Sequence, residues 1–255
     1  STRLAGVSPW VWFLIAGLAA FLGAALLLVD HGRRTAHQRE RRRWAALRGW
    51  RFVPSDPVLA DRWRHGVISR GGAGIARNLV IGSLFTPVGR RPVQIFDHEQ
   101  SGKISTVVAA VRRRFHAGDL VVEMWLPDRP APQDPGMRML GPVGPRYVFG
   151  TDLSRVRPLI TPELIFTCNE MGEDIPVVWL EQDWVLAAAP PTASPARLEL
   201  LLRAMDAMAD QLDLATGEAT PAGDETAEPE DKNAEPDDAA GSADSSDRSI
   251  RNTSP

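Results

Sequence analysis

Residues 10–44, WVWFLIAGLAAFLGAALLLVDHGRRTAHQRERRRW, change character within a few positions. The first part, residues 10–29, contains no charged side chain, whereas seven arginines follow between positions 33 and 48. At a rise of about 1.5 Å per residue, the apolar run forms a helix of about 30 Å, which is the thickness of the hydrocarbon core of a bilayer. Trp10 and Trp12 stand at its start, and indole rings favour the headgroup region. The stretch predicts a transmembrane helix over residues 10–29.

A cleaved signal peptide is the main alternative for this segment. In a signal peptide the positive charges precede a shorter apolar run, and a small-residue cleavage site follows it. Here the arginines come after the run, and Asp30-His31-Gly32-Arg33 is a poor cleavage site. We therefore expect an uncleaved, single-pass anchor in the inner (plasma) membrane. Because positive charge accumulates on the cytoplasmic side, residues 1–9 should form a short extracytoplasmic N-terminus, and the chain after residue 29 should be cytoplasmic.

The arginines admit two interpretations, a nucleic-acid arm or a collar at the membrane surface. Residues 1–50 carry eight arginines against two acids, a net charge of +6, whereas residues 51–215 have a net charge of -1. A nucleic-acid-binding domain is basic over its folded part, so we expect no nucleic-acid partner. Each arginine near an anionic leaflet gains about 1 kcal/mol. We expect a juxtamembrane helix over residues 30–48 whose arginines bind anionic inner-membrane lipids: Arg33, Arg34, Arg39, Arg41, Arg42 and Arg43.

The rest of the chain alternates between β-rich and helical segments. Apolar and β-branched runs bounded by turn residues predict strands; they cover residues 50–53, 76–85, 92–99, 103–115, 119–127, 146–151, 164–170, 176–182 and 183–189. Asp56, followed by Pro57, is a favourable start for a short helix. A further helical segment follows Asp152. Ser194 and Pro195 begin a last helix, and its apolar residues recur at intervals of three and four: Leu198, Leu201, Leu202, Met205, Met208 and Leu212.

Tight connections between these strands favour antiparallel pairing. The chain therefore predicts an α+β fold, a mostly antiparallel sheet with two to four helices in a cytoplasmic domain over residues 49–215. Six prolines and three glycines in residues 127–145 indicate a surface loop. Residues 216–255 carry a net charge of -8 and no aromatic residue. Such a segment buries too little apolar surface to offset chain entropy, so we expect a disordered acidic tail.

No motif in the chain indicates catalysis, a cofactor or a metal. The glycine-rich residues 70–78 lead into a strand and lack the Lys-Ser or Lys-Thr pair of a phosphate loop. In Asp97-His98-Glu99, successive side chains of a strand point to opposite faces, and no second histidine lies nearby. Cys168, the single cysteine, lies in an expected half-buried strand, where a thiol acts as a small hydrophobe. A G-x-S-x-G nucleophile motif is missing from the sequence. We expect a non-enzymatic protein without a catalytic, cofactor-binding or metal site.

Three sequence stretches carry a family resemblance: residues 48–63 (RGWRFVPSDPVLADRW), 76–99 (ARNLVIGSLFTPVGRRPVQIFDHE) and 180–188 (LEQDWVLAA). With the anchor and the arginines they resemble a family of actinobacterial single-pass membrane proteins, and within it the mycobacterial trehalose monomycolate transport factors. The similarity covers about residues 5–215. It implies an accessory role in moving a mycolate glycolipid to the cell envelope, beside a resistance-nodulation-division type exporter in the inner membrane.

Two hypotheses for the function follow, with a hydrolase as a third that no motif supports. The first is a membrane-anchored adaptor that binds the trehalose monomycolate exporter; a filled core and an exposed apolar patch would favour it. The second is a lipid-binding module that holds an acyl chain of a glycolipid in an apolar cavity. Four tryptophans lie in β-rich or helical stretches: Trp63, Trp125, Trp179 and Trp184. We expect them to pack in the core, although a tryptophan-lined cavity facing the membrane would favour lipid binding.

Overall fold

A computed structural model describes residues 9–218 apart from residues 71–73, 88, 130–131 and 133. The described residues fall in one compact unit, which lies within residues 1–220. Most of the predicted extracytoplasmic N-terminus (residues 1–8) and of the predicted disordered tail (residues 219–255) lie outside the described residues, so both stay predictions.

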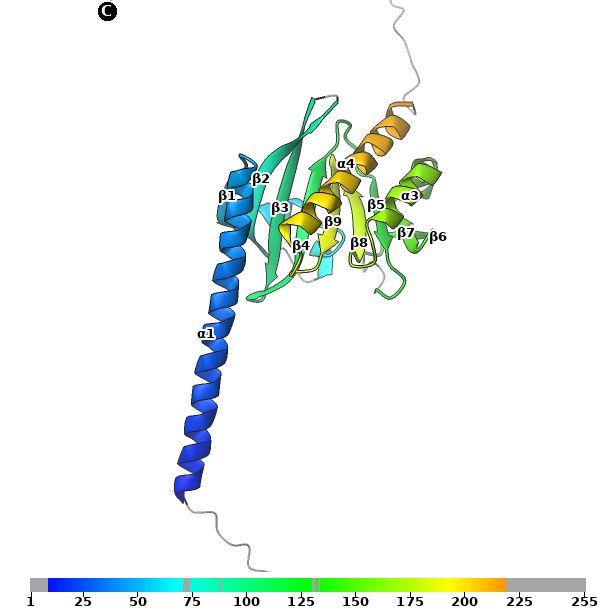
Figure 1. Ribbon diagram of the computed structural model, residues 1–255. Coiled ribbons are helices and arrows are strands. Elements are labelled where there is room, and N and C mark those ends of the chain that lie inside the picture. Colours follow the sequence, from blue (N-terminus) through cyan, green and yellow to red (C-terminus); the bar gives the residue numbers. More distant parts are fainter. Residues whose placement is uncertain (1–8, 71–73, 88, 130–131, 133, 219–255) are drawn as a thin grey trace, which may run out of the picture. The chain divides into compact units, whose positions relative to one another are not determined.

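The chain begins with one long helix, α1 (Pro9–Leu47). The apolar run and the arginine-rich segment, for which separate spans over residues 10–29 and 30–48 are predicted, are parts of this single helix (Figure 1). Large apolar side chains described in its first half are exposed, including Phe13 at 78% and Phe21 at 70%. The side chains of Val11 and of residues 27–34 are outside the described set.

A transmembrane span over residues 10–29 was the expectation from the sequence. Among the residues whose side chains are described, no helix is both long and apolar enough to cross a membrane.

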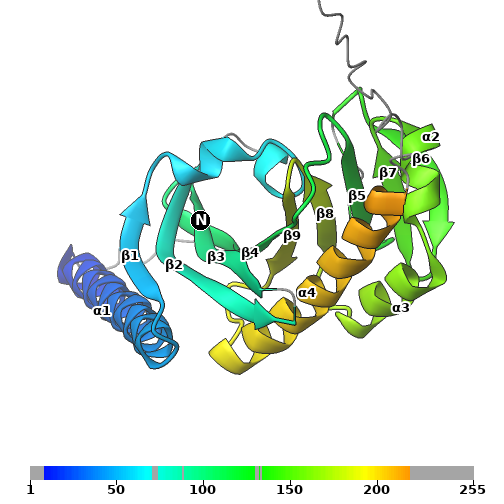
Figure 2. The same cartoon turned by 90° about the horizontal axis from the view of Figure 1, so that it is seen from above.

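The described part of the chain contains nine strands in one sheet, in the order β1-β2-β3-β4-β9-β8-β5-β7-β6 (Figure 2). Their bounds are β1 (Arg51–Asp56), β2 (Ile75–Thr86), β3 (Gly89–Gln100), β4 (Lys103–Arg112), β5 (Val121–Trp125), β6 (Arg138–Val143), β7 (Arg146–Gly150), β8 (Val177–Glu181) and β9 (Trp184–Ala189). Every pairing is antiparallel. The α+β fold class and the antiparallel sheet are therefore confirmed.

Three further α-helices and three 3₁₀ turns complete the described elements. They are α2 (Leu153–Val156), α3 (Pro162–Glu170) and α4 (Pro195–Glu218), with η1 (Leu59–Arg62), η2 (Ile68–Arg70) and η3 (Arg157–Leu159). Helix α4 begins as predicted, because the Ser194 hydroxyl accepts a hydrogen bond from the Arg197 amide at 3.3 Å. Its apolar stripe, including Leu198 and Met205, is fully buried against the sheet.

The sheet is covered on both faces, and each face has its own core. One core joins the C-terminal end of α1, α3 and α4 to the sheet. On the other face lie η1, η2 and a second core, which contains four of the eight tryptophans: Trp63, Trp125, Trp179 and Trp184. There Trp63 stacks on Phe96 with ring centroids 5.8 Å apart and meets Trp184 edge to face at 5.8 Å. Aromatic pairs in these geometries stabilise a core beyond their buried area, so these tryptophans pack as expected.

The strand predicted over residues 164–170 is wrong, because this segment is helix α3. Thr161 caps the helix: its side chain accepts a hydrogen bond from the Leu164 amide at 3.2 Å. Pro162 occupies the first turn, where its missing amide proton costs nothing. The apolar run from Leu164 resembles a strand, but the capping threonine and proline decide for a helix.

Two other boundaries differ from the sequence predictions. The predicted loop over residues 127–145 contains β6, whose pairing with β7 shifts register between Met139 and Gly141. Strand β1 continues through Pro54 to Asp56, so the predicted helix near Asp56 is delayed to η1. The Asp56 carboxylate accepts hydrogen bonds from the Val58 and Leu59 amides, both at 3.0 Å. It therefore caps this turn.

Gly66, which lies against the Trp179 ring in the core beneath η1 and η2, gives a test of this packing. Gly66 has φ +62°, and a Cβ there would lie 2.6 Å from the Trp179 ring. We expect Gly66→Ala to destabilise the fold by about 1 kcal/mol through its backbone and by about 1–3 kcal/mol more through overpacking. Gly49 has a similar φ of +66° but open space around it, so Gly49→Ala should show only the first effect. Urea unfolding measures both; equal losses would contradict the packing argument.

Candidate functional site

A buried ion pair joins α1 to the sheet. The guanidinium of Arg41, on α1, lies with Nη2 3.4 Å from Oδ1 of Asp97 on β3, and neither side chain is more than 1% exposed. Burial lowers the pKa of Arg41, and the nearby charge of Asp97 opposes that change. Because an unpaired buried charge is costly, this contact fixes the position of the helix on the sheet.

Further polar contacts surround Asp97. Asn78 donates a hydrogen bond to Asp97 Oδ2 at 2.7 Å, and His37 Nε2 lies 3.3 Å from the same oxygen. Asn78 has φ +49° and follows the register shift after Arg77 in β2. The bulge thus points an amide donor at the carboxylate, and the polar half of α1, β2 and β3 meet at one buried group.

A second contact joins α1 to α4. The indole of Trp44 donates a hydrogen bond to Glu199 Oε1 at 2.8 Å. Arg48 Nη2 lies 2.7 Å from the same oxygen. These two bonds lower the pKa of Glu199. The C-terminal half of α1 is therefore part of the folded domain.

The predicted membrane-collar arginines differ in their exposure to solvent. Arg39, Arg42 and Arg43 are exposed, whereas Arg41 is buried against Asp97. The side chains of Arg33 and Arg34 lie outside the described residues. The predicted interface residues Trp10 and Trp12 are 62% and 63% exposed. Sequence reasoning missed the role of Arg41; the available signal was Asp97, an acid directly after the apolar run of β3.

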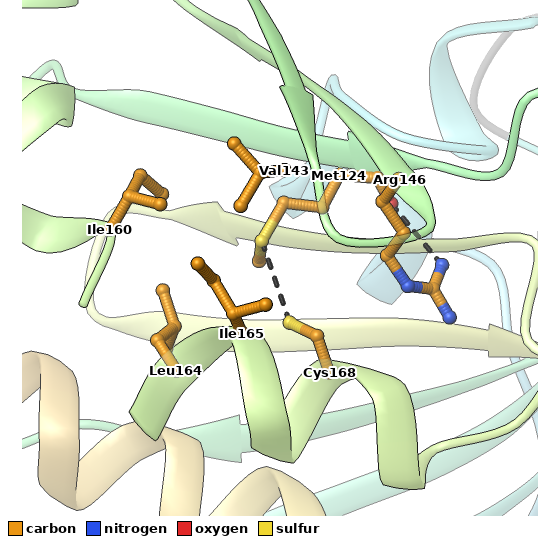
Figure 3. Close-up of a pocket in the computed structure, with 7 residues that line it drawn as sticks. All are labelled: Met124, Val143, Arg146, Ile160, Leu164, Ile165 and Cys168. Atoms are coloured by element: carbon orange, nitrogen blue, oxygen red, sulfur yellow. Dashed lines mark hydrogen bonds between the residues drawn. The ribbon is translucent and has the colours of Figure 1, made fainter. Parts of the chain in front are cut away.

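A pocket beside α3 is closed (Figure 3). It is lined by Met124, Val143, Arg146, Ile160, Leu164, Ile165 and Cys168, and the space between them does not admit a water-sized sphere. The Cys168 sulfur lies 3.6 Å from the Met124 sulfur. Burial raises the pKa of the Cys168 thiol to about 11, although Arg146 opposes this shift. A neutral, enclosed thiol is a poor nucleophile, so Cys168 packs as a small hydrophobe.

An open groove lies on the other face of the sheet, beyond the part that η1 and η2 cover. Its residues come from β5, β6, β7 and the loop after β5, and they are Trp125, Leu126, Pro127, Arg129, Met139, Tyr147 and Phe149. The volume is about 290 Å³. Met139 is 51% exposed and Tyr147 is 36% exposed. Sequence analysis did not find this groove, although Tyr147 and Phe149 share one face of their strand.

Two buried carboxylates lie near the groove, Glu123 on β5 two residues before Trp125 and Glu181 on β8. Glu123 accepts hydrogen bonds from the Trp125 indole at 2.6 Å and from the Gly66 amide at 2.9 Å. Glu181 accepts from the amides of Arg64 at 2.8 Å and His65 at 3.2 Å. Burial raises the pKa of Glu181, and a hydrogen bond to Glu123 raises that of His65. The oxygens are occupied by these donors, so this cluster holds residues 64–66 on the sheet.

The remaining sequence candidates hold structural contacts. Asp97 and His98 are buried, and Glu99 forms an ion pair with Arg77 at 3.1 Å. Within the described residues, no three acidic, histidine or cysteine side chains are arranged to hold a metal ion. Of the glycine-rich stretch, residues 71–73 lie outside the described set, and Ile75 begins β2.

The Arg41–Asp97 contact can be tested with neighbouring arginines. We expect Arg41→Met to destabilise the fold by about 3 kcal/mol, because it leaves the buried Asp97 carboxylate without its main counter-charge. Arg42→Met changes an exposed side chain and should stay within about 0.5 kcal/mol. Chemical denaturation of the two variants measures the difference. A loss in Arg41→Met no larger than that in Arg42→Met would show that the ion pair does not hold the helix.

The closed pocket predicts the reactivity of Cys168. At about pH 8 the buried thiol should resist iodoacetamide in the folded protein and react once urea unfolds it. The folded state favours the neutral thiol, so Cys168 contributes to the free energy of unfolding. This contribution is present below the ordinary thiol pKa of about 9 and is lost as the pH rises through about 11. Phe166→Cys, at a site 63% exposed on the same helix, should react without urea. Alkylation of native Cys168 as fast as that of Cys at 166 would contradict a closed pocket.

Comparisons with known proteins place this geometry in a family. Residues 8–255 match the family model "Trehalose monomycolate transport factor TtfA". Trehalose monomycolate transport factor A from Mycolicibacterium smegmatis (strain ATCC 700084 / mc(2)155) is 32% identical over 203 residues, which are 79% of this chain and 69% of that protein. The crystal structure of the mycobacterial trehalose monomycolate transport factor A matches with a TM-score of 0.61 and 29% identity, over 69% of this chain and 93% of that one. The chain therefore belongs to the trehalose monomycolate transport factor TtfA family.

Proposed function

We propose that the chain is a non-enzymatic, membrane-anchored accessory factor in trehalose monomycolate transport, and that it acts by binding a resistance-nodulation-division type exporter in the inner membrane. The family, whose members are named for this transport, supports the process. The exporter is what the family resemblance of the sequence implies, and the mode of action is our inference from the way the domain is attached to its helix.

The observation that carries the proposal is the buried contact between Arg41 and Asp97. A loosely tethered domain would need only a flexible linker after its anchor. Here the helix continues without interruption from the apolar run into the fold, and the ion pair holds it there. Such an attachment confines the domain to the membrane plane in a defined orientation. Confinement raises its effective concentration near an integral partner.

The anchor and its orientation are part of the same proposal. The uncharged residues 10–29 and their exposed aromatic side chains, Trp10, Trp12 and Phe13, support insertion into a bilayer. The excess of arginine after the run supports an N-terminus outside and a cytoplasmic domain. The exposed side chains of Arg39, Arg42 and Arg43 support a collar on anionic lipids, shared with Arg33 and Arg34 by sequence.

A second candidate is the lipid-binding module, in which the domain itself holds an acyl chain. The closed pocket beside Cys168 leaves no space for one. The open apolar groove of about 290 Å³ favours this candidate, and it is compatible with an adaptor. We place the adaptor first because the pocket among the described interior residues beside Cys168 has no room for a ligand.

Crosslinking in intact membranes, followed by identification of the copurifying proteins, tests the adaptor. We expect the exporter among the crosslinked proteins of the full chain. A double variant, Arg41→Met with Asp97→Asn, removes both buried charges and so avoids an uncompensated one. It should stay in the membrane fraction but recover less exporter, because the contact that fixes the helix against β3 is lost while Trp44 and Arg48 still join α1 to α4.

Arg42→Met is the matched control and should recover the exporter like the unchanged chain. Recovery of no transporter or envelope protein with the unchanged chain would refute the adaptor. Full recovery with the double variant would show that a fixed attachment is not what the partner requires.

A further inference from the structure

The floor of the groove is built by four side chains on one face of three paired strands. Trp125 lies opposite Tyr147, and Phe149 lies opposite Met139. Side chains at directly opposite positions of antiparallel strands are in contact, so the four form a continuous apolar surface. Among the described elements, η1 and η2 pack on another part of this sheet face (Figure 2), and the groove lies beside that part.

One cation completes the lining. Arg129 follows the end of β5, and its amide donates a hydrogen bond to the Leu126 carbonyl at 3.1 Å, which turns the loop back beside the groove. Arg129 is 47% exposed, and among the described residues it forms an ion pair with the exposed Asp128 at 3.5 Å. Exposed pairs of this kind contribute about 1 kcal/mol at most. The guanidinium therefore stays available to an anion at the end of the apolar floor.

The edge of the sheet beside the groove is unsuited to a peptide strand. Strand β6 shifts register between Met139 and Gly141, Gly141 has φ +135°, and Pro142 lacks an amide proton. Peptides that extend a sheet need a regular row of backbone donors and acceptors. What the groove offers is an apolar surface with one cation. Its volume is at the lower end of the range for ligand sites, about 300–1,000 Å³.

From this chemistry we propose that the groove binds a long-chain fatty acid, with its carboxylate at Arg129 and its alkyl chain over Met139, Tyr147 and Phe149. Arg129 lies beyond the end of β5, at the end of the sheet that carries the β3–β4 turn and faces the apolar half of α1 (Figure 1). With the anchor of the proposed function, on which this orientation rests, a ligand held there has its head toward the membrane. The proposal does not depend on the exporter.

Photolabelling of the full chain tests the site. The protein is placed in nanodiscs of phosphatidylcholine, irradiated with palmitic acid that carries a diazirine on its chain, and digested for mass spectrometry. We expect label on peptides that contain Trp125–Arg129 and Met139–Phe149, and we expect excess unlabelled palmitate to remove it. Label confined to residues 10–29, or label that palmitate does not displace, would overturn the proposal.

Two variants separate the chain contact from the head contact. Met139→Glu introduces a charge into the apolar floor and should lower labelling about tenfold, whereas Leu200→Glu, at a site 58% exposed on α4, should leave it unchanged. Arg129→Gln should lower labelling by the acid about threefold and leave labelling by the corresponding diazirine fatty alcohol unchanged. Equal loss with both probes would overturn the role of Arg129.

The outcome is separate from that of the exporter experiment. If the exporter is not recovered but the palmitate label is displaced and sensitive to Met139→Glu, the fatty-acid site stands alone. If Met139→Glu abolishes exporter recovery and leaves the label unchanged, the groove binds protein, and the fatty-acid proposal is refuted.

Discussion

The buried ion pair between Arg41 and Asp97 is the contact on which the arrangement of helix and sheet depends. Taking two charges out of water costs several kcal/mol per ion, and such a pair persists only where further hydrogen bonds satisfy it. Asn78 supplies one of them from a left-handed backbone position, and that position exists because β2 carries a bulge there. The bulge in β2, the burial of Asp97 and the position of α1 on the sheet therefore depend on one another.

Three other buried carboxylates of the described residues, Glu123, Glu181 and Asp213, accept hydrogen bonds from the backbone. Glu123 and Glu181 accept bonds from the amides of residues 64–66. Asp213, on α4, accepts a bond from the Arg114 amide at 3.1 Å and one from Arg113 Nε at 3.0 Å. Each carboxylate accepts a hydrogen bond from a backbone amide that lies outside the strands and so lacks a carbonyl partner in the sheet.

The sequence predicted the elements whose signals are local. The hairpin of β2 and β3 and the cap of α4 at Ser194 depend on neighbouring residues, and they were predicted. The segment after Leu164 was misassigned because an apolar run of that length fits a strand and a helix equally well. The groove and the role of Arg41 needed tertiary information: charge density along the chain does not tell which arginine of a helix faces a distant aspartate. The sheet order, which places β9 beside β4, is likewise invisible locally.

The uninterrupted helix α1 has a geometric consequence for any partner. Between residues 29 and 41 an α-helix rises by about 18 Å, and no loop in this stretch of α1 can absorb a change in that length. Adding or removing one residue there changes the distance along the helix axis between residues 10–29 and the sheet by about 1.5 Å. It also rotates the domain by about 100° about that axis. A change in the length of this segment therefore alters the direction in which the domain faces far more than it alters the distance of the domain from residues 10–29. Helical phase, more than spacing, limits which insertions and deletions the segment tolerates.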